Sequence, residues 1–129
     1  MPLDSFAAIN QSSFSARDLQ GIDQWTTWTP TYSFTTATSL TVTGRFRVVG
    51  RQCFFQVKSS GTSLATTVNV SYINMPMAVK GNGGIGSMTN RTTHTAVGIG
   101  DIDPDTSCFY PPTQAASGNT FTFAGWFEV

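Results

Sequence analysis

The sequence predicts an antiparallel β-sandwich that follows a short N-terminal arm. Three observations carry this prediction: short segments of alternating apolar residues, Gly, Pro, Asn and Ser between those segments, and a composition rich in hydroxyl groups. The 129 residues include 20 Thr and 13 Ser, whereas charged residues make up only 11%, against about 25% in a typical soluble domain. Because Thr is β-branched and suits the exposed side of a strand, the sheets are expected to present hydroxyl groups to solvent.

Alternation is clearest at the C-terminal end, over residues 121–129. Phe121, Phe123 and Phe127 fall on one side of this segment, and Trp126 falls on the other. A strand that is apolar on both sides is either central in the core or partly covered by a neighbouring subunit. The segment is therefore expected to be essential for folding or for assembly.

Four earlier segments alternate in the same way. Phe46 and Val48 share a face, and residues 49–51 are expected to turn the chain. No segment after residue 24 has a helical period, so residues 25–129 are expected to form a sandwich of about eight short strands. The other three alternating sets are Cys53, Phe55 and Val57; Val68, Val70 and Tyr72; and Thr95, Val97 and Ile99.

Residues 1–24 differ from the rest and are interpreted as an arm. Their apolar residues are separated by Ser, Asn and Gln, and a short helix is expected over residues 15–20, where Ser15 can cap it and Gly21 can end it. Such an arm is a candidate contact with a partner protein. Its candidate contact residues are Leu3, Phe6, Ile9, Phe14 and Leu19.

Charge and hydropathy argue against nucleic-acid and membrane partners. The net charge is zero, and a nucleic-acid binder needs clustered bases to displace counterions from phosphates. Arg45, Arg47 and Arg51 are separated by apolar residues and are interpreted as solvent-exposed arginines of a hairpin. The chain has no apolar run of about 18 residues and begins without a signal peptide, so it is expected to act without secretion.

The two cysteines, Cys53 and Cys108, are too few for a disulfide framework. One bridge between them remains an alternative. Two buried thiols are the expected state, because the chain is expected to fold in the cytoplasm.

Two matches to ligand motifs fail in their context. Residues 81–86 match G-x-G-x-x-G, but residues 87–93 are a poor helix, and the dinucleotide motif needs a helix N-terminus there. A loop with positive φ angles is the expected structure. Asp101, Asp103 and Asp105 alternate like the first ligands of a calcium loop, but its sixth and twelfth positions are Thr106 and Pro112, which favours an acidic turn.

No catalytic group is predicted. His94 is the only histidine, and no oriented third group or nucleophile setting accompanies it or either cysteine. The acids are few and lie mostly in the arm or in one loop, so two facing carboxylates are not expected. The sequence thus predicts no catalytic residue, no cofactor and no metal, and points to assembly or recognition.

Aromatic residues among hydroxyls and amides are the remaining candidates for function. Three interpretations stay open: they cover the ends of the sandwich, they form a subunit interface, or they stack on the sugars of a glycan. The candidates are Trp25, Trp28, Tyr32, Tyr110 and Trp126.

Several of these residues belong to an ordered set of motifs. W-T-T-W-T-P-T (residues 25–31) precedes G-R-F-R-V-V-G-R-Q-C (residues 44–53), then I-N-M-P (residues 73–76), then the aromatic segment at residues 121–129. This order resembles a β-sandwich domain common in the surface proteins of tailed-phage virions. The resemblance covers residues 25–129 and implies a jelly-roll-like, trimeric protein that is assembled in the host cytoplasm and displayed on the virion.

The resemblance leaves two functions open. Fibre domains of this type usually end a long chain, whereas only about 24 residues precede the domain here. This difference favours a capsid decoration (cement) protein that binds the major capsid protein or another virion protein. The alternative is a fibre tip or carbohydrate-binding module that recognises a host surface glycan.

Overall fold

The computed structural model describes residues 24–129, which form strands joined by turns and loops. All strand pairs in this part of the chain are antiparallel, as the alternation predicts. None of the described residues belongs to a helix long and apolar enough to cross a membrane. The strands are β1 (Thr26–Trp28), β2 (Tyr32–Ser33), β3 (Thr36–Thr38), β4 (Thr41–Val49), β5 (Gln52–Ser60), β6 (Ser63–Thr66), β7 (Tyr72–Asn74), β8 (Gly84–Asn90), β9 (Thr95–Asp103), β10 (Cys108–Tyr110), β11 (Gln114–Ser117) and β12 (Phe121–Glu128).

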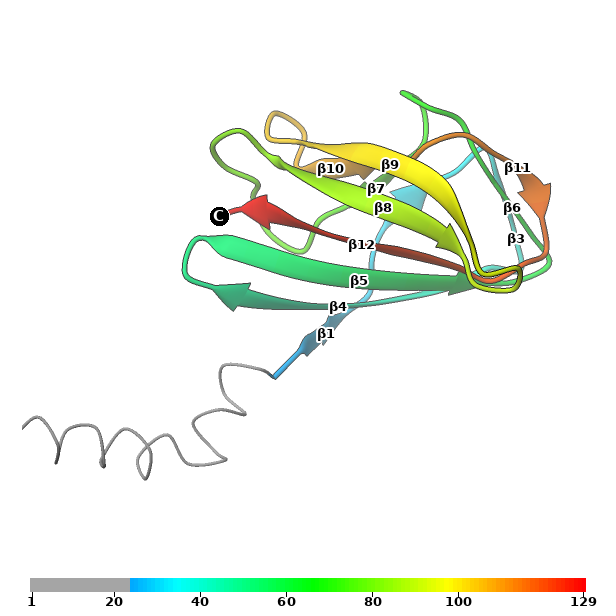
Figure 1. Cartoon of the computed structure of the whole chain (residues 1–129), viewed down its shortest axis with the longest axis horizontal. Helices are drawn as coiled ribbons and strands as arrows, with labels where there is room; N and C mark the ends of the chain where they lie inside the picture. The colour runs from blue at the N-terminus through cyan, green and yellow to red at the C-terminus, as the bar shows by residue number, and fades with distance from the viewer. Residues whose placement is uncertain (1–23) are drawn as a thin grey trace, which may run out of the picture.

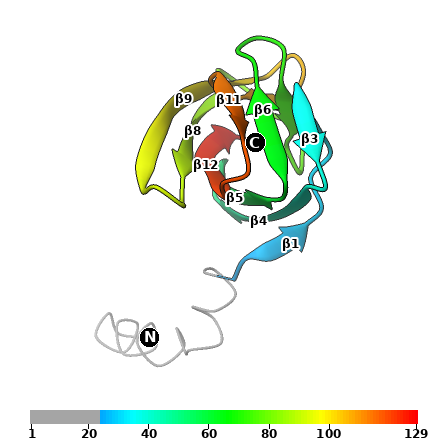
Figure 2. The same ribbon diagram turned by 90° about the vertical axis from the view of Figure 1, so that its right-hand side faces the viewer.

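These strands form two sheets of unequal size. Nine strands follow the order β1-β4-β5-β12-β8-β9-β10-β7-β2, and β11-β6-β3 form the second sheet. Figure 1 shows the long strands β4, β5, β12, β8 and β9 as one broad twisted layer. Figure 2 shows the large sheet curling around an interior, with β3, β6 and β11 across one end.

The curl brings together the two edges of the large sheet. Its edge strands β1 and β2 are consecutive in the chain and are separated only by residues 29–31. The step from Trp28 to Tyr32 spans at most about 14 Å, so the two edges must lie close to each other. The backbone N–H of Asn74 donates to the carbonyl of Thr31 at 2.9 Å and ties this crossing to β7. The short segment between β1 and β2 thus joins the two edges of the large sheet.

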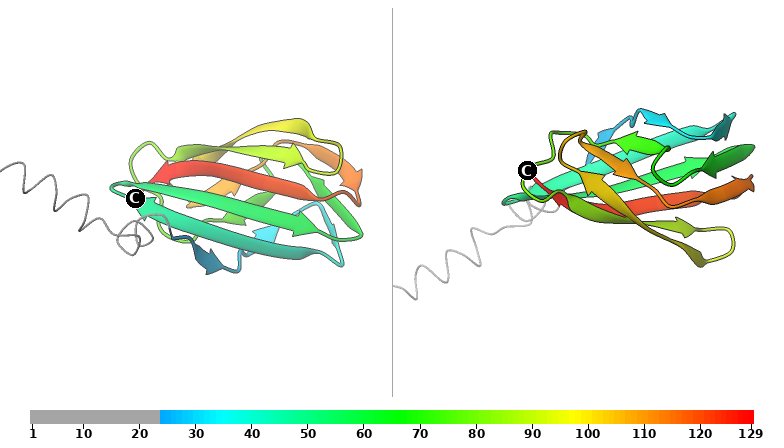
Figure 3. Two further views of the ribbon diagram at one scale, coloured as in Figure 1. Left: turned by 60° about the horizontal axis from the view of Figure 1, so that its bottom comes forward. Right: turned by 90° about the horizontal axis from the view of Figure 1, so that it is seen from above.

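The C-terminal strand β12 is central, as its apolar character on both sides predicts. It pairs with β5 on one side and with β8 on the other, and Figure 3 shows it in the middle of the broad layer. Phe121, Phe123 and Phe127 point into the core and are fully buried. The predicted alternation of Cys53, Phe55 and Val57 is confirmed too, because all three lie in the same core.

The core is built around the ring of Phe109 on β10. This ring contacts Phe55 and Phe123 and lies directly over Gly86 and Gly100, which pair across β8 and β9. A Cβ atom on Gly86 would lie 2.7 Å from the ring, and one on Gly100 would lie 2.6 Å from it. These two glycines therefore leave the space that the ring fills.

Two of the predicted strand segments are wrong in detail. Residues 68–70 form a turn in which Asn69 has φ of 65°, so Val68 and Val70 are 52% and 64% exposed and do not alternate with a buried partner. In β9 the register with β8 shifts between Met88 and Thr89. Because of this bulge, Val97 and Ile99 lie on opposite faces, and Ile99 is 68% exposed.

The number of strands also exceeds the expected eight. The described residues form twelve strands, of which β1, β2, β3, β7 and β10 are three residues or shorter. Such short elements are too brief to show period-two alternation, so the sequence pattern detects only the longer strands.

The motifs behind the phage resemblance pack against each other. Trp28 lies over Gly44, where a Cβ atom would come within 2.6 Å of the indole ring and 2.9 Å of Pro30. The same indole meets the Phe46 ring edge-on at a centroid distance of 5.9 Å. In the third motif, Ile73 is a fully buried core residue. Trp28, Gly44, Phe46 and Ile73 therefore build the fold, and a binding role must be sought among other residues.

Candidate functional site

The face of the large sheet that points away from the core carries the most distinctive surface of the described chain. We call it the outer face. Residues on it alternate with the buried Phe residues of β12 and with the core residues of β5 and β8. Across β5, β12 and β8, the register places Phe54 opposite Trp126 and Trp126 opposite Ile85. Towards the other end of the strands, Lys58 lies opposite Thr122, and Thr122 opposite Thr89.

The end of the outer face that lies near the C-terminus is apolar. Phe54, Ile85, Ile99 and Trp126 form the apolar patch, on four successive strands. Trp126 is 37% exposed, Ile85 44% and Ile99 68%. Phe54, Trp126 and Ile85 stand directly opposite one another, where side chains on paired strands lie about 5 Å apart. Ile99 is a diagonal neighbour of Ile85, whose direct partner on β9 is Asp101. Single exposed apolar residues are ordinary, whereas a contiguous group of them marks an interaction surface.

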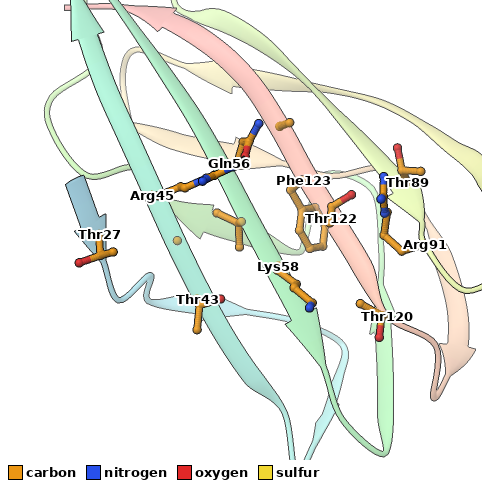
Figure 4. Close-up of a pocket in the computed structure, with 13 residues that line it drawn as sticks. Thr27, Thr43, Arg45, Gln56, Lys58, Thr89, Arg91, Thr120, Thr122 and Phe123 are labelled. Carbon is orange, nitrogen blue, oxygen red and sulfur yellow. Dashed lines mark hydrogen bonds between the residues drawn. The ribbon is translucent and has the colours of Figure 1, made fainter. Parts of the chain in front are cut away.

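The other end of the outer face is a shallow polar hollow of about 890 Å³. Residues of β4, β5 and β12 line it, and no Asp or Glu does. Figure 4 shows the polar side chains around the hollow, which come from β1, β4, β5, β8, β12 and adjoining turns. We call it the basic hollow. Its polar side chains are Thr27, Thr43, Arg45, Gln56, Lys58, Thr89, Arg91, Thr120 and Thr122.

One cation of the basic hollow is held in a fixed position. The Nε and Nη2 atoms of Arg45 both donate to Oε1 of Gln56, at 2.9 and 2.6 Å, across the β4–β5 pair. The guanidinium also lies over the ring of Trp25, at 4.8 Å from its centroid. Arg47 lies over the same ring at 5.1 Å and over the ring of Phe54 at 5.6 Å. A bidentate hydrogen bond and cation–π contacts together restrict these long side chains.

The other two cations of the hollow are not neutralised by the described chain. Neither Lys58 nor Arg91 has a side-chain hydrogen bond or ion pair with another residue of the range 24–129. Cationic, amide and hydroxyl groups therefore converge on this surface without a competing carboxylate. The local potential must favour an anion.

The acidic groups of residues 24–129 lie away from the hollow. Asp101 and Asp103 lie at the end of β9, and Asp105 lies in the turn that follows, where Oδ1 of Asp103 accepts the N–H of Asp105 at 2.9 Å. At the end of β12, Oε2 of Glu128 accepts the N–H of Asn82 at 2.9 Å. No group of three or more His, Cys, Asp or Glu in the described range has a metal-binding arrangement. The expected acidic turn is correct for Asp103 and Asp105, whereas Asp101 is paired with Ile85 and Tyr110 within the sheet.

The five aromatic candidates are not brought together in one site. Trp25 and Trp126 both belong to the outer face, where the strand register puts Arg47 and Phe54 between them. The other three occupy separate places: Trp28 packs over Gly44, Tyr32 stacks on Phe34 at 4.7 Å, and Tyr110 lies 6.3 Å from Tyr72 and donates its hydroxyl to Thr106. The arm candidates Leu3, Phe6, Ile9, Phe14 and Leu19 lie outside the described residues.

Both cysteines are buried and unbridged, as expected from their number. Burial raises the pKa of the Cys53 thiol to about 11, and burial likewise raises the pKa of the Cys108 thiol, against a hydrogen bond with Thr106 that lowers it. A raised pKa disfavours the thiolate, which is the nucleophilic form. The environments of the two thiols are therefore those of core residues.

The dinucleotide-like motif also has a structural explanation. Gly81 and Gly83 have φ angles of 58° and 78°, so the expected positive φ angles are confirmed. Gly84 then begins β8, so a strand stands where the motif requires a helix N-terminus. Gly86, the last glycine of the motif, is the one that accommodates the ring of Phe109.

The residues of the basic hollow are absent from the candidates that the sequence suggests. Gln56 and Lys58 are visible as the polar members of an alternating segment, and Arg45 as part of a hairpin, but nothing local indicates that β12 separates them from Arg91. Only the strand order brings these cations to one surface. Comparison with protein-family models, with curated proteins and with solved structures gives no match for this chain.

Proposed function

We propose that the chain is a surface protein of a tailed-phage virion, which forms trimers and decorates and stabilises the head. The ordered motifs of residues 25–129 support the virion assignment. The observation that carries the contact role is the apolar patch, which covers four strands of a domain with an otherwise hydroxyl-rich sequence.

Covering the exposed apolar area of the patch would stabilise a contact. Trp126 alone exposes on the order of 90 Å², given that a Trp side chain buries up to about 250 Å², and covering this area contributes about 2 kcal/mol. Ile85 and Ile99 add further apolar area beside it. Trp and Arg are the residues most often found at the energetic centre of an interface, and here Arg47 flanks Phe54.

The arm precedes Trp25 in the sequence. The ring of Trp25 lies under Arg45 and Arg47 at the β4 side of the outer face. The candidate contact residues Leu3, Phe6, Ile9, Phe14 and Leu19 belong to the segment that leads up to this residue. We expect the arm and the patch to act together, and to stabilise the head because they bind the assembled shell only.

Two matched serine variants test this function. Trp126→Ser removes the centre of the patch, and Val70→Ser removes a more exposed apolar side chain from a turn outside the sheets. Trp126→Ser is expected to weaken self-association and binding to heads that lack the protein by at least about tenfold, whereas Val70→Ser leaves both unchanged. Sedimentation and co-pelleting with heads measure these effects. Equal behaviour of the two variants, or a wild-type chain that neither associates nor pellets, contradicts the proposal.

A second function, a receptor-binding module for a host surface glycan, is favoured by the basic hollow. Hydroxyl, amide and cationic groups over an open surface suit a carbohydrate ligand better than they suit an apolar partner. Saturable binding to host cells that is lost on changing residues of the hollow supports this function. The same loss on changing Trp28 would reflect misfolding, because Trp28 packs within the fold.

A further inference from the structure

We propose that the basic hollow binds an acidic polysaccharide, that is, a sugar chain that carries carboxylate or sulfate groups. The inference concerns the ligand class of this hollow, and it does not depend on the role of the apolar patch in assembly. Its basis is the set of groups that line the hollow, their spacing, and the absence of competing acids.

The lining groups match the polar atoms of such a ligand. Lys58 and Arg91 are cations without a side-chain partner among residues 24–129, so an anionic group gains two charge-assisted contacts without breaking existing ones. Arg45 is held by Gln56 and Trp25, so it loses little conformational freedom when a ligand binds. The five Thr side chains around these cations offer both donors and acceptors to sugar hydroxyls.

The spacing of the cations favours a chain over a single ion. Arg45 lies on β4, Lys58 on β5 and Arg91 directly after β8, with β12 between β5 and β8. Adjacent strands are about 4.8 Å apart, so the row from β4 to β8 extends over about 14 Å. No two of these cations lie on the same strand. A polymer that presents anionic groups at intervals fits this arrangement better than one phosphate or sulfate ion does.

Nucleic acid fits the hollow less well. Proteins that bind single strands combine a basic groove with aromatic rings on which bases stack. Phe123 is the one aromatic residue that lines the hollow, and its side chain is fully buried on the core side of the sheet. The nearby ring of Trp25 is covered by Arg45. With three cations, a single strand would bind with a weak salt dependence, with a slope of about −2.

The chain offers matched controls for a binding experiment. Lys58→Met and Arg91→Gln each remove one charge from the hollow. Lys80→Met and Arg51→Gln make the same chemical changes at positions outside it. The probes are hyaluronan, which is carboxylated, dextran sulfate, neutral dextran and single-stranded oligo-dT. Affinity electrophoresis and isothermal titration measure binding on full-length chains whose urea unfolding midpoints equal that of the wild type.

We expect the wild type to bind hyaluronan, dextran sulfate or both, and to bind neutral dextran much more weakly. Lys58→Met and Arg91→Gln are each expected to reduce this affinity at least about fivefold, while Lys80→Met and Arg51→Gln leave it unchanged. The preferred probe then identifies carboxylate or sulfate as the recognised group.

Four results overturn the inference. The first is equal binding of neutral and acidic polysaccharides, and the second is an equal loss in hollow and control variants. The third is a clear preference for oligo-dT. Salt-dependent self-association that Lys58→Met abolishes, without polysaccharide binding, would also overturn it and would assign the hollow to the acidic turn of a second copy. The results with polysaccharides and oligo-dT do not bear on the effect of Trp126→Ser on head binding, so this inference and the proposed function fail independently.

Discussion

Replacing Gly86 with Ala is expected to destabilise the fold through a single contact, with the ring of Phe109. Gly86 does not have a positive φ angle, so the backbone tolerates a side chain there. The added Cβ atom would lie 2.7 Å from Cε1 of Phe109 and 3.1 Å from Cδ1 and Cζ of the same ring. Carbon atoms in contact normally lie about 3.5–4.0 Å apart, so the ring must move by roughly 1 Å.

The size of the effect follows from the packing of that ring. Phe109 is fully buried and contacts Phe55 and Phe123, so a shift of its ring disturbs the centre of the core. Overpacking of this kind costs about 1–3 kcal/mol of unfolding free energy. In a Phe109→Leu background the smaller side chain leaves space for the methyl group, and Gly86→Ala is expected to cost less than about 1 kcal/mol. The coupling between the two changes should therefore be about 1–2 kcal/mol.

Urea unfolding of the wild type, both single variants and the double variant measures this coupling. For a domain of this size the urea m-value is about 1–3 kcal/mol/M, so the coupling corresponds to a midpoint shift of roughly 0.3–2 M. Phe127→Leu provides the control background, because the closest contacts of the added methyl group are all with Phe109. Additivity of Gly86→Ala and Phe109→Leu within about 0.5 kcal/mol would refute the reasoning. It would also reopen the question of what the last glycine of the G-x-G-x-x-G match does.

Three further predictions concern burial. The pKa of Cys53 is about 11 in the fold and 9.0 in the unfolded chain, so the folded state binds the thiol proton more tightly. The free energy of unfolding should therefore fall as pH rises from about 9 to 11. Cys53→Ala should reduce this pH dependence in urea titrations, and an unchanged slope contradicts the assignment. Deletion of residues 125–129 removes the fully buried Phe127 from the central strand β12. Near-ultraviolet circular dichroism of the truncated chain should therefore show no folded protein. A truncated chain that folds and assembles would count against this account. Thr66→Val removes the hydroxyl that donates to the carbonyl of Pro112 at 2.6 Å. The free energy of unfolding, measured in urea, should fall by about 1–3 kcal/mol. A neutral effect would mean that water replaces the hydroxyl.

The sequence predicts the fold where the signal is local. The alternation of Phe121, Phe123 and Phe127, and that of Cys53, Phe55 and Val57, reports which side of a strand is buried, and the structure confirms both. The strand segment around Val68 and Val70 is wrong because β-branched residues also occur in turns. Asn69 carries the relevant signal, since Asn tolerates the left-handed conformation that this turn requires.

The predicted face of Ile99 fails for a related reason. Strict alternation places Ile99 beside Val97, whereas the bulge next to Gly98 reverses the faces after it. An isolated glycine inside a strand pattern is a recognised sign of a bulge, so this part was accessible to sequence reasoning.

The basic hollow was not accessible in the same way. Lys58, Thr122 and Arg91 are distant in the sequence, and they share a surface because β12 inserts between β5 and β8. Strand order depends on long-range pairing that no local pattern reports. The apolar patch was partly foreseen, because Trp126 stood opposite the row of Phe residues, but its neighbours Ile85 and Ile99 also depend on strand order.

The most direct test of the central claim, that the apolar patch is the contact surface on the virion, is oxidative footprinting of the chain on assembled heads and in isolation. The account predicts that Trp126 and Phe54 become protected from hydroxyl radicals on the head, while Val68 and Val70 react equally in both states. Trp126 that reacts on the head as it does in isolation, or protection confined to the turn at residues 68–70, would contradict it.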